Sequence, residues 1–436
     1  MNTIELIQQR FDQLEEQNKH SYLSPLRKDA LRAFHQMGIP TVRHEEWKYT
    51  RIGSVFNKEF DAPIGREITI TSADLESLRL PGSSAANEIV FVNGVYSRAL
   101  SSIRSRDLTV TTLEEASVHP DFNSLVERHL GGSRKYLKDG INALNMAFMH
   151  QGVFIFLKRK QVLAEPVYIY HLTDSRAMHV LAQPRSLVYL SEGSQAEIME
   201  AYESLGAQEN LTNQVTECVL EQEAVLHYYK IQNDSSAANQ VSTTHIHQTG
   251  KSHVHTVIIT LNGGMVRNNT NIVMDAPHSE AHLYGLYFGS GHTHIDNHTI
   301  VDNRKPNCLS NELYKGIMDD DATGVFNGKI FVEQEAQKTN AYQSNKNVLL
   351  SENASVNTKP QLEIFADDVK CSHGCTVGRL DDEGLFYLRS RGISEQTAKA
   401  LLLQAFASDI LEQIRPEALR QYVHARIVNR LESEKV

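Results

Sequence analysis

The sequence predicts a mainly β protein in which a long β-solenoid of stacked coils lies between an N-terminal and a C-terminal helical domain. Three observations predict this fold class. Apolar residues at helical spacing are confined to the two ends of the chain, short β-rich runs with polar turns occupy the middle, and those runs recur at intervals near 28 to 30 residues. The expected domains are residues 1–87, 88–383 and 384–436.

Two helices are expected at the N-terminus. The first is predicted by apolar residues at helical spacing, namely Ile4, Ile7, Phe11 and Leu14. The second begins at Ser24, a predicted N-cap followed by Pro25 at the first helical position, and ends just before Gly38.

The β region is expected to begin at Glu88. A run of apolar residues there enters the turn Asn93-Gly94, which is typical of a tight hairpin. Further β-rich runs are Val153–Leu157, Val167–His171 and Ser186–Leu190. The helical pattern of the first domain therefore gives way to strands.

A repeat organises the middle of the chain. A small or polar residue enters a short apolar strand at six places, separated by 28, 29, 28, 43 and 30 residues: Ala196, Ala224, His253, Ala281, Gly324 and Ala354. We expect these residues at comparable points of successive coils, with the 43-residue interval as an enlarged coil. Several units carry a second strand-like run, so two strands per coil are expected. A large antiparallel sandwich remains the alternative.

The C-terminal domain is expected to contain two amphipathic helices. Ser394 is the predicted N-cap of the first, whose apolar stripe includes Leu401 and Phe406, and Pro416 begins the second. The two stripes could bury against each other, or they could form a docking surface for another chain.

Composition excludes several classes of function. Lys and Arg number 43 against 53 Asp and Glu, so the net charge is −10 and the totals do not indicate nucleic acid as a partner. The apolar runs are far shorter than the roughly 18 residues of a membrane span, and Met1–Lys19 is too polar for a signal peptide. Four cysteines are typical of a reducing compartment. We expect a cytoplasmic protein without membrane contact.

The segment Gln248–Ser252 contains Thr-Gly-Lys-Ser, which resembles the end of a phosphate-binding loop. The motif requires a glycine at position 245, where this chain has His245. We therefore expect that this chain binds no nucleotide, and that a partner hydrolyses any ATP that is used. Common motifs of hydrolases and dehydrogenases are also missing from the sequence, which argues against an enzyme.

Histidines are concentrated in the middle of the chain, where they include His245, His247, His253, His255, His278, His282, His292, His294 and His298. In a strand, residues i and i+2 point to one face, so each His-x-His pair could bind a metal ion. The alternative function is therefore a metal-dependent enzyme with a cupin-like β-fold. The sequence lacks the acidic ligand and glycines expected after such a pair.

The strongest candidate site lies in the segment Asp367–Gly378. Cys371, His373 and Cys375 alternate, so an extended strand would project two thiols and an imidazole from one face. These soft donors suit zinc or an iron–sulfur species, but a closed zinc site needs a fourth ligand. We interpret the set as transient and completed across an interface; simple packing of Cys371 is the alternative reading.

Six segments carry a resemblance to a known family: Glu45–Tyr49, His292–His298, Gly324–Ile330, Ala336–Asn345, Pro360–Gly374 and Gly384–Ile393. In these segments the chain resembles the SufB/SufD family of iron–sulfur cluster assembly proteins. Leu388 stands where SufB-like chains are expected to carry a cysteine, so the resemblance is to the SufD branch.

The resemblance implies a right-handed parallel β-helix flanked by helical domains. It also implies a non-catalytic scaffold that supports iron acquisition, pairs with a SufB-like subunit and binds a SufC-like ATPase through the C-terminal domain. Cys371 and His373 match the family motif for interfacial ligands of a cluster or of iron, held transiently and shared with the partner. Cys375 departs from the SufD pattern. The choice between homodimer and heterodimer stays open.

The expected ATPase-docking surface is the turn before the C-terminal helices, together with the first of those helices. Its candidate residues are Arg389, Arg391, Gly392, Leu401 and Phe406.

Overall fold

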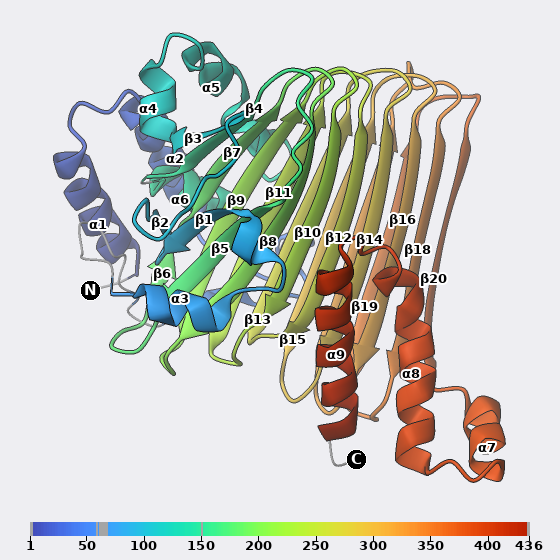
Figure 1. Ribbon diagram of the computed structural model, residues 1–436. Helices are drawn as coiled ribbons and strands as arrows, with labels where there is room; N and C mark the ends of the chain where they lie inside the picture. The colour runs from blue at the N-terminus through green and yellow to red at the C-terminus, as the bar shows by residue number, and fades with distance from the viewer. Residues whose placement is uncertain (1–2, 58–59, 61–68, 150, 434–436) are drawn as a thin grey trace.

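The computed structural model describes residues 3–57, 60, 69–149 and 151–433. Two long sheets face each other across an apolar interior, and helices lie at both ends of the chain (Figure 1). The first sheet contains, in spatial order, β2 (Val95–Tyr96), β1 (Asn87–Val92), β5 (Val167–Asp174), β8 (Gln195–Leu205), β10 (Val225–Asn233), β12 (His253–Asn262), β14 (Glu280–Gly289), β16 (Leu309–Met318), β18 (Asn340–Leu349) and β20 (Lys370–Arg379).

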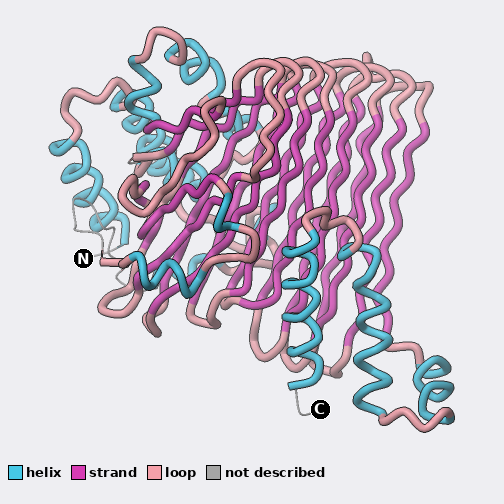
Figure 2. Tube along the Cα trace, in the orientation of Figure 1, coloured by secondary structure: helices cyan, strands magenta, loops and turns pink. Residues whose placement is uncertain are grey.

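The second sheet is built from the intervening strands. In spatial order it contains β19 (Ser355–Ile364), β17 (Thr323–Val332), β15 (His294–Asn303), β13 (Met265–Met274), β11 (Ala238–Gln248), β9 (Asn210–Leu220), β7 (Arg185–Leu190), β4 (Val153–Leu157) and β3 (Leu108–Thr112), with β6 (Leu181–Ala182) beside β9. From β8 onward the chain alternates between the sheets, and neighbouring strands are parallel. The predicted solenoid with two strands per coil is confirmed, and the antiparallel sandwich is wrong. Figure 2 shows the strands stacked side by side along the solenoid.

The interior is formed by residues that align from coil to coil. Along the first sheet one column contains Ala196, Leu226, Val254, Ala281, Ser310, Ala341 and Cys371. Side chains alternate between the two faces of a strand, so such columns fill the interior while their sequence neighbours face outward.

The predicted equivalence of six repeat positions is wrong in part. Ala281 is on β14 of the first sheet, whereas Gly324 is on β17 of the second. The next positions in register with Ala281 are Ser310 and Ala341. The 43-residue interval is therefore a change of sheet and not an enlarged coil. Small residues enter strands of both sheets, so spacing alone does not distinguish one sheet from the other.

The N-terminal helical region extends beyond the predicted boundary at residue 87. Its helices are α1 (Thr3–Gln17), α2 (Ser24–Met37), α3 (Ser72–Leu78), α4 (Leu113–Val118), α5 (Asn123–His129) and α6 (Gly140–Ala147), with 3-10 turns at Glu45–Trp47, Ile52–Asn57, Ser83–Ala85 and Gly132–Lys135. One apolar cluster joins residues of α1, α2 and α6 to the outer face of the second sheet. Helices that precede β1 in the chain and helices that follow it therefore both cover the first coils.

Local signals at α2 were partly correct. Gly38 ends the helix with a φ of 66°, and its N–H donates to the Phe34 carbonyl over 2.7 Å. Ser24 is the first helical residue and not the N-cap, because its hydroxyl donates to the Glu15 carboxylate instead of capping the helix. The predicted Asn93-Gly94 turn is confirmed, with φ values of 52° and 84°.

Three helices follow the solenoid: α7 (Asp382–Ser390), α8 (Glu395–Leu411) and α9 (Glu417–Ser433). Ser394 caps α8 as expected, since its side chain accepts from the Thr397 N–H over 3.2 Å. Apolar residues of α8 and α9 cover the outer face of the first sheet. Sequence reasoning missed α7, which is drawn apart from the solenoid in Figure 1. Among the described residues, no helix has the length and apolar character needed to cross a membrane.

Candidate functional site

The last coil of the solenoid is much more exposed than the others. β19 and β20 are the final strands of their sheets, so each has a neighbour on one side only within the sheet. Every residue of β20 except Cys371 is exposed, whereas β13, in the middle of the solenoid, is buried along its whole length. The C-terminal end of the solenoid is therefore open.

The three predicted donor residues lie on this open strand. Cys371, His373 and Cys375 occupy alternate positions of β20, as expected. Cys371 packs against the apolar interior, so all three positions belong to the inner face of the strand. Because no further coil covers them, the side chains of His373 and Cys375 are exposed. The donors therefore line the mouth of the solenoid.

Polar side chains lie directly beneath these donors. His373 is in register with Gln343 and Glu312 on the two preceding coils. The Gln343 amide donates to the Glu312 carboxylate over 2.7 Å. Burial raises the pKa of Glu312 to about 7, opposed by hydrogen bonds from Thr299 and Gln343. The interior just below the mouth therefore contains hydrogen-bonding groups, which a purely apolar core would lack.

The three donors do not form a complete metal site. The backbone positions of Cys371 and Cys375 are roughly 13 Å apart along an extended strand, so all three donors cannot meet at one ion without rearrangement, although neighbouring donors could share one. Burial raises the pKa of the Cys371 thiol, so a metal or a positive group is needed to favour the thiolate. These three side chains therefore offer an incomplete set of donors in the geometry observed.

The predicted docking residues divide into two groups. Arg389 lies in the last turn of α7, and Arg391 and Gly392 follow it, with Gly392 at a φ of 86° where the chain turns toward α8. Leu401 is 42% exposed. Phe406 is half-buried, and the Lys315 Nζ lies 4.8 Å from the centre of its ring, so Phe406 anchors α8 to the solenoid.

Two exposed aromatic residues of α7 were missed. Phe386 is 75% exposed and Tyr387 is 57% exposed, although both are large and carry apolar rings. Both lie in the family-like segment Gly384–Ile393, and their exposure depends on how α7 is placed. Each residue of α7 is at least partly exposed, so the helix has an uncovered apolar surface.

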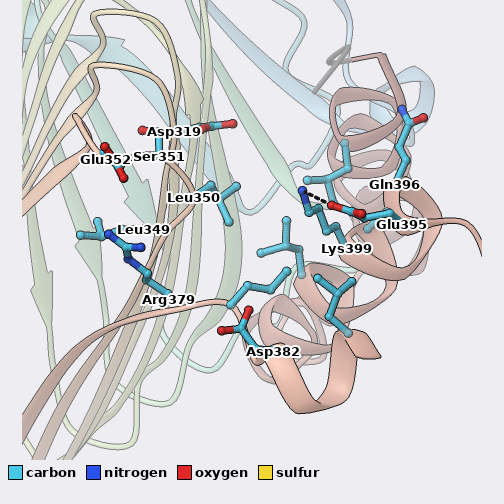
Figure 3. A pocket seen from close by; sticks show the side chains of 15 residues that line it. Asp319, Leu349, Leu350, Ser351, Glu352, Arg379, Asp382, Glu395, Gln396 and Lys399 are labelled. Atoms are coloured by element: carbon cyan, nitrogen blue, oxygen red, sulfur yellow. Dashed lines mark ion pairs between the residues drawn. The ribbon is translucent and has the colours of Figure 1, made fainter. Parts of the chain in front are cut away.

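A cavity of about 500 Å³ separates α7 and the start of α8 from the last coils. Figure 3 shows Asp319, Ser351 and Glu352 on the solenoid side and Glu395, Gln396 and Lys399 on the helix side. Lys399 and Glu395 pair with each other over 3.1 Å and not across the cavity. Among these labelled side chains, all within the described part of the chain, no ion pair therefore bridges the cavity.

Most of the central histidines lie on outer faces of the solenoid, whereas His278 and His292 lie in turns between strands. Among those on the outer faces, His245 is buried beside Tyr136, His294 shares a 2.9 Å hydrogen bond with Thr50, and His298 lies 3.5 Å from the Glu46 carboxylate. These contacts attach N-terminal segments to the second sheet. The cupin-like alternative expected such histidines in a β-barrel, and that fold is not the one observed.

Comparisons with known proteins agree with this architecture. The model of the SufBD core domain of the SUF iron–sulfur cluster assembly system matches residues 171–406, and that of the SufBD N-terminal region matches residues 2–169. The chain is 34% identical to the iron–sulfur cluster assembly protein SufD of Escherichia coli over 94% of this chain and 93% of the relative. It is 30% identical to a SufBD family protein of Synechocystis sp., over 89% and 88%. It is 31% identical to the chloroplastic protein ABCI7 of Arabidopsis thaliana, over 58% and 55%.

The fold and the two family matches define a β-solenoid protein of iron–sulfur cluster assembly. The chain belongs to the SufBD family, and its similarity to SufD of Escherichia coli extends over nearly its full length. The resemblance inferred from the sequence is thereby confirmed.

Proposed function

We propose that the chain is a non-catalytic scaffold subunit that assembles iron–sulfur clusters in the cytoplasm together with a SufB-like subunit and a SufC-like ATPase. One observation carries this proposal: the solenoid ends in an open coil whose inner face presents Cys371 and His373. An exposed strand edge at the end of two long sheets is a template for pairing with another chain.

The SufB-like subunit would pair with this open end. The backbone of β20 hydrogen-bonds within the sheet only to β18, which leaves its other edge available. A Cβ placed on Gly374 or Gly378 would meet nothing within 4 Å, so the outer face of β20 is also uncovered at these positions. Pairing would extend both sheets and cover the exposed side chains. In isolation, the same edges would favour a homodimer.

The nascent cluster, or iron on its way to it, would be the cargo of this interface. A thiolate and an imidazole are suitable donors for iron, and two donors from one chain leave positions for the partner. Because neither chain would hold a complete set, separating the two would open the site and release the cargo. Cys371 and His373 would supply this chain's share, whereas Cys375 is a secondary candidate.

The SufC-like ATPase would dock on α7 and the adjoining face of α8. The uncovered surface combines Phe386, Tyr387 and Leu401 with the charges of Arg389 and Arg391. Exposed aromatic residues beside arginine are typical of interface hot spots. ATP-dependent movement of this docked helix would be transmitted to the solenoid through α8, which Phe406 and Lys315 hold against β16.

Co-expression with the SufB-like and SufC-like proteins of the same organism tests the proposal. We expect a stable complex whose ATPase is lost when Phe386→Ala and Tyr387→Ala are combined, while the SufB-like subunit is retained. Tyr22→Ala is the matched control, because Tyr22 is 60% exposed but lies near the N-terminus. Full ATPase binding by the double variant would contradict this docking surface. Deleting the whole C-terminal domain is a poorer test, because α8 and α9 also cover the first sheet.

A further inference from the structure

Four histidines lie close together on the outer face of the first sheet. Their strands are in the middle of that sheet, away from its two edge strands. The histidines are His227 on β10, His253 and His255 on β12, and His282 on β14. His227, His255 and His282 are directly paired across the three strands, and His253 is paired with Glu280. The alternate residue Val254 is fully buried in the interior, so these imidazoles face outward.

Two of the four imidazoles are used by the connection between α8 and α9. The His255 Nε2 lies 2.9 Å from the carbonyl oxygen of Gln413 and donates to it. The His227 Nε2 lies 2.7 Å from the Arg415 guanidinium and accepts from it. The nitrogens that make these bonds are not available to a metal ion. His227 and His255 therefore attach the helices to the sheet.

The other two imidazoles converge on a carboxylate. The His253 Nδ1 lies 3.3 Å from the Glu280 Oε2, and the His282 Nε2 lies 4.0 Å from the same oxygen. Among the described residues, these form the one group of three metal-ligating side chains whose ligand atoms all lie within 4.8 Å of one another. Their side chains are 31%, 49% and 22% exposed, so an ion can reach them from solvent.

We propose that His253, Glu280 and His282 form a binding site for a divalent first-row transition-metal ion, the class that includes Fe²⁺ and Zn²⁺. Two imidazole nitrogens and one carboxylate oxygen are a common donor set for these ions. Bonds of about 2.0 to 2.2 Å place ligand atoms roughly 3.0 to 3.5 Å apart, so small side-chain rotations complete the site. Three ligands leave positions for water, so the bound ion exchanges readily.

The chemistry of the donors favours this binding. An uncharged imidazole offers a nitrogen lone pair to a metal ion. Glu280 supplies the negative charge that a divalent cation requires. Direct bonds from the ion to the two imidazoles and the carboxylate would replace the weak contacts that these three groups now make with one another.

This site is separate from the open end of the solenoid. β14 and β20 are three strand spacings apart, which corresponds to about 14 Å across the sheet. The site therefore does not depend on pairing with another solenoid, and it goes beyond the proposed scaffold function. Its position beside the connection of α8 and α9 places a metal ion next to the elements that attach the C-terminal domain.

Cobalt titration of the full chain, purified without a histidine tag and treated with chelator, tests the proposal. We expect one equivalent of Co²⁺ to bind and to produce visible d–d absorption bands. His253→Ala and His282→Ala should each weaken binding at least tenfold, and Glu280→Gln should weaken it as well. His292→Ala is the matched control and should leave binding unchanged, because His292 is 89% exposed and lies 3.7 Å from a single carboxylate, that of Asp321.

A second variant separates this site from the thiols. The double variant Cys371→Ser/Cys375→Ala should retain the Co²⁺ bands of the wild type, whether or not it loads clusters. Zn²⁺ should raise the melting temperature of the wild type and the His292→Ala control, but not that of His282→Ala. Absence of stoichiometric Co²⁺ binding by the wild type, or equal binding by all variants, would overturn the proposal. Loss of bands in the thiol variant would overturn it too.

Discussion

The two ends of the solenoid differ in what covers them. At the N-terminal end, β1 and β3 form antiparallel pairs with neighbouring strands, and helices α1, α2 and α6 bury residues such as Phe34 and Leu144. At the C-terminal end, β19 and β20 have no such cover among the described residues. A repeat array needs a cap at each end, and the proposed pairing with a SufB-like subunit would supply the one at this end.

The interiors near the two ends differ as well. Toward the N-terminal side, burial alone would raise the pKa of Glu200, but the Lys230 ammonium 3.6 Å away holds that pKa well below its usual range. Near the open end, Glu312 has a neutral partner, Gln343, and its pKa is raised to about 7. The Glu200 carboxylate is therefore paired with a charged ammonium, whereas Glu312 has a neutral partner and a raised pKa.

The largest expected effect contrasts two phenylalanines. Phe34 is fully buried under the N-terminal cap, so Phe34→Ala should lower the free energy of unfolding by about 3 to 5 kcal/mol. Phe386 is 75% exposed on α7, so Phe386→Ala should change it by less than about 0.5 kcal/mol. Chemical denaturation of the isolated chain measures both. Similar losses for the two variants would mean that α7 is packed as tightly as the cap.

A second prediction uses pH to sharpen the contrast between the interiors. In the folded chain Glu312 keeps its proton up to about pH 7, whereas in the unfolded chain it loses the proton near its ordinary pKa of 4.5. The contribution of Glu312 to the free energy of unfolding is therefore fully present below about pH 4.5. It falls by about 3 kcal/mol as the pH rises to about 7.

Glu312→Gln removes this dependence because the amide does not ionise. The variant should match the wild type near pH 4 and should be more stable at pH 8, by up to about 3 kcal/mol. Unfolding measured across this pH range provides the test. A wild type and variant that differ by the same amount at every pH would show that Glu312 does not titrate in this range.

At Cys371 we expect a small effect on stability and a large one on cluster assembly. The thiol is only half-buried, so Cys371→Ser should lower the free energy of unfolding of the isolated chain by about 1 kcal/mol or less. The same change replaces a soft donor by a hard one, so clusters reconstituted on the complex should be largely lost. Cluster content per complex, measured by iron and sulfide analysis, checks this.

Two further variants complete the series at this site. His373→Ala should also reduce cluster content, because it removes the imidazole, whereas Cys375→Ala should be the mildest. If Cys371→Ser and His373→Ala complexes form normally and carry wild-type amounts of iron and sulfide, the ligand role is wrong and the strand is ordinary interface packing.

The sequence predicted most of what depends on neighbouring residues. Ser394 and Gly38 mark helix ends, and Asn93-Gly94 marks a turn, because these signals act within a few residues. The alternation of Cys371 and His373 on a strand was predictable for the same reason.

Features set by long-range packing were not predicted. The sheet to which Gly324 belongs depends on coil register, and the exposure of Phe386 depends on where α7 lies. Likewise, convergence of His253 and His282 on Glu280 requires two strands to be placed side by side. The repeat spacing predicts that successive coils stack, but it does not give the exact register of each strand or the sheet to which it belongs.

Hydrogen exchange of the open end, in the isolated chain and in the complex with the SufB-like and SufC-like proteins, tests the central claim most directly. Amides of residues 370–379 and 355–364 should exchange faster in the isolated chain than those of β13, because the last coil is exposed on one side. In the complex they should become strongly protected, while the amides of β1 and β4 should be unchanged. Unchanged exchange in residues 370–379, with new protection at the N-terminal end instead, would contradict the account.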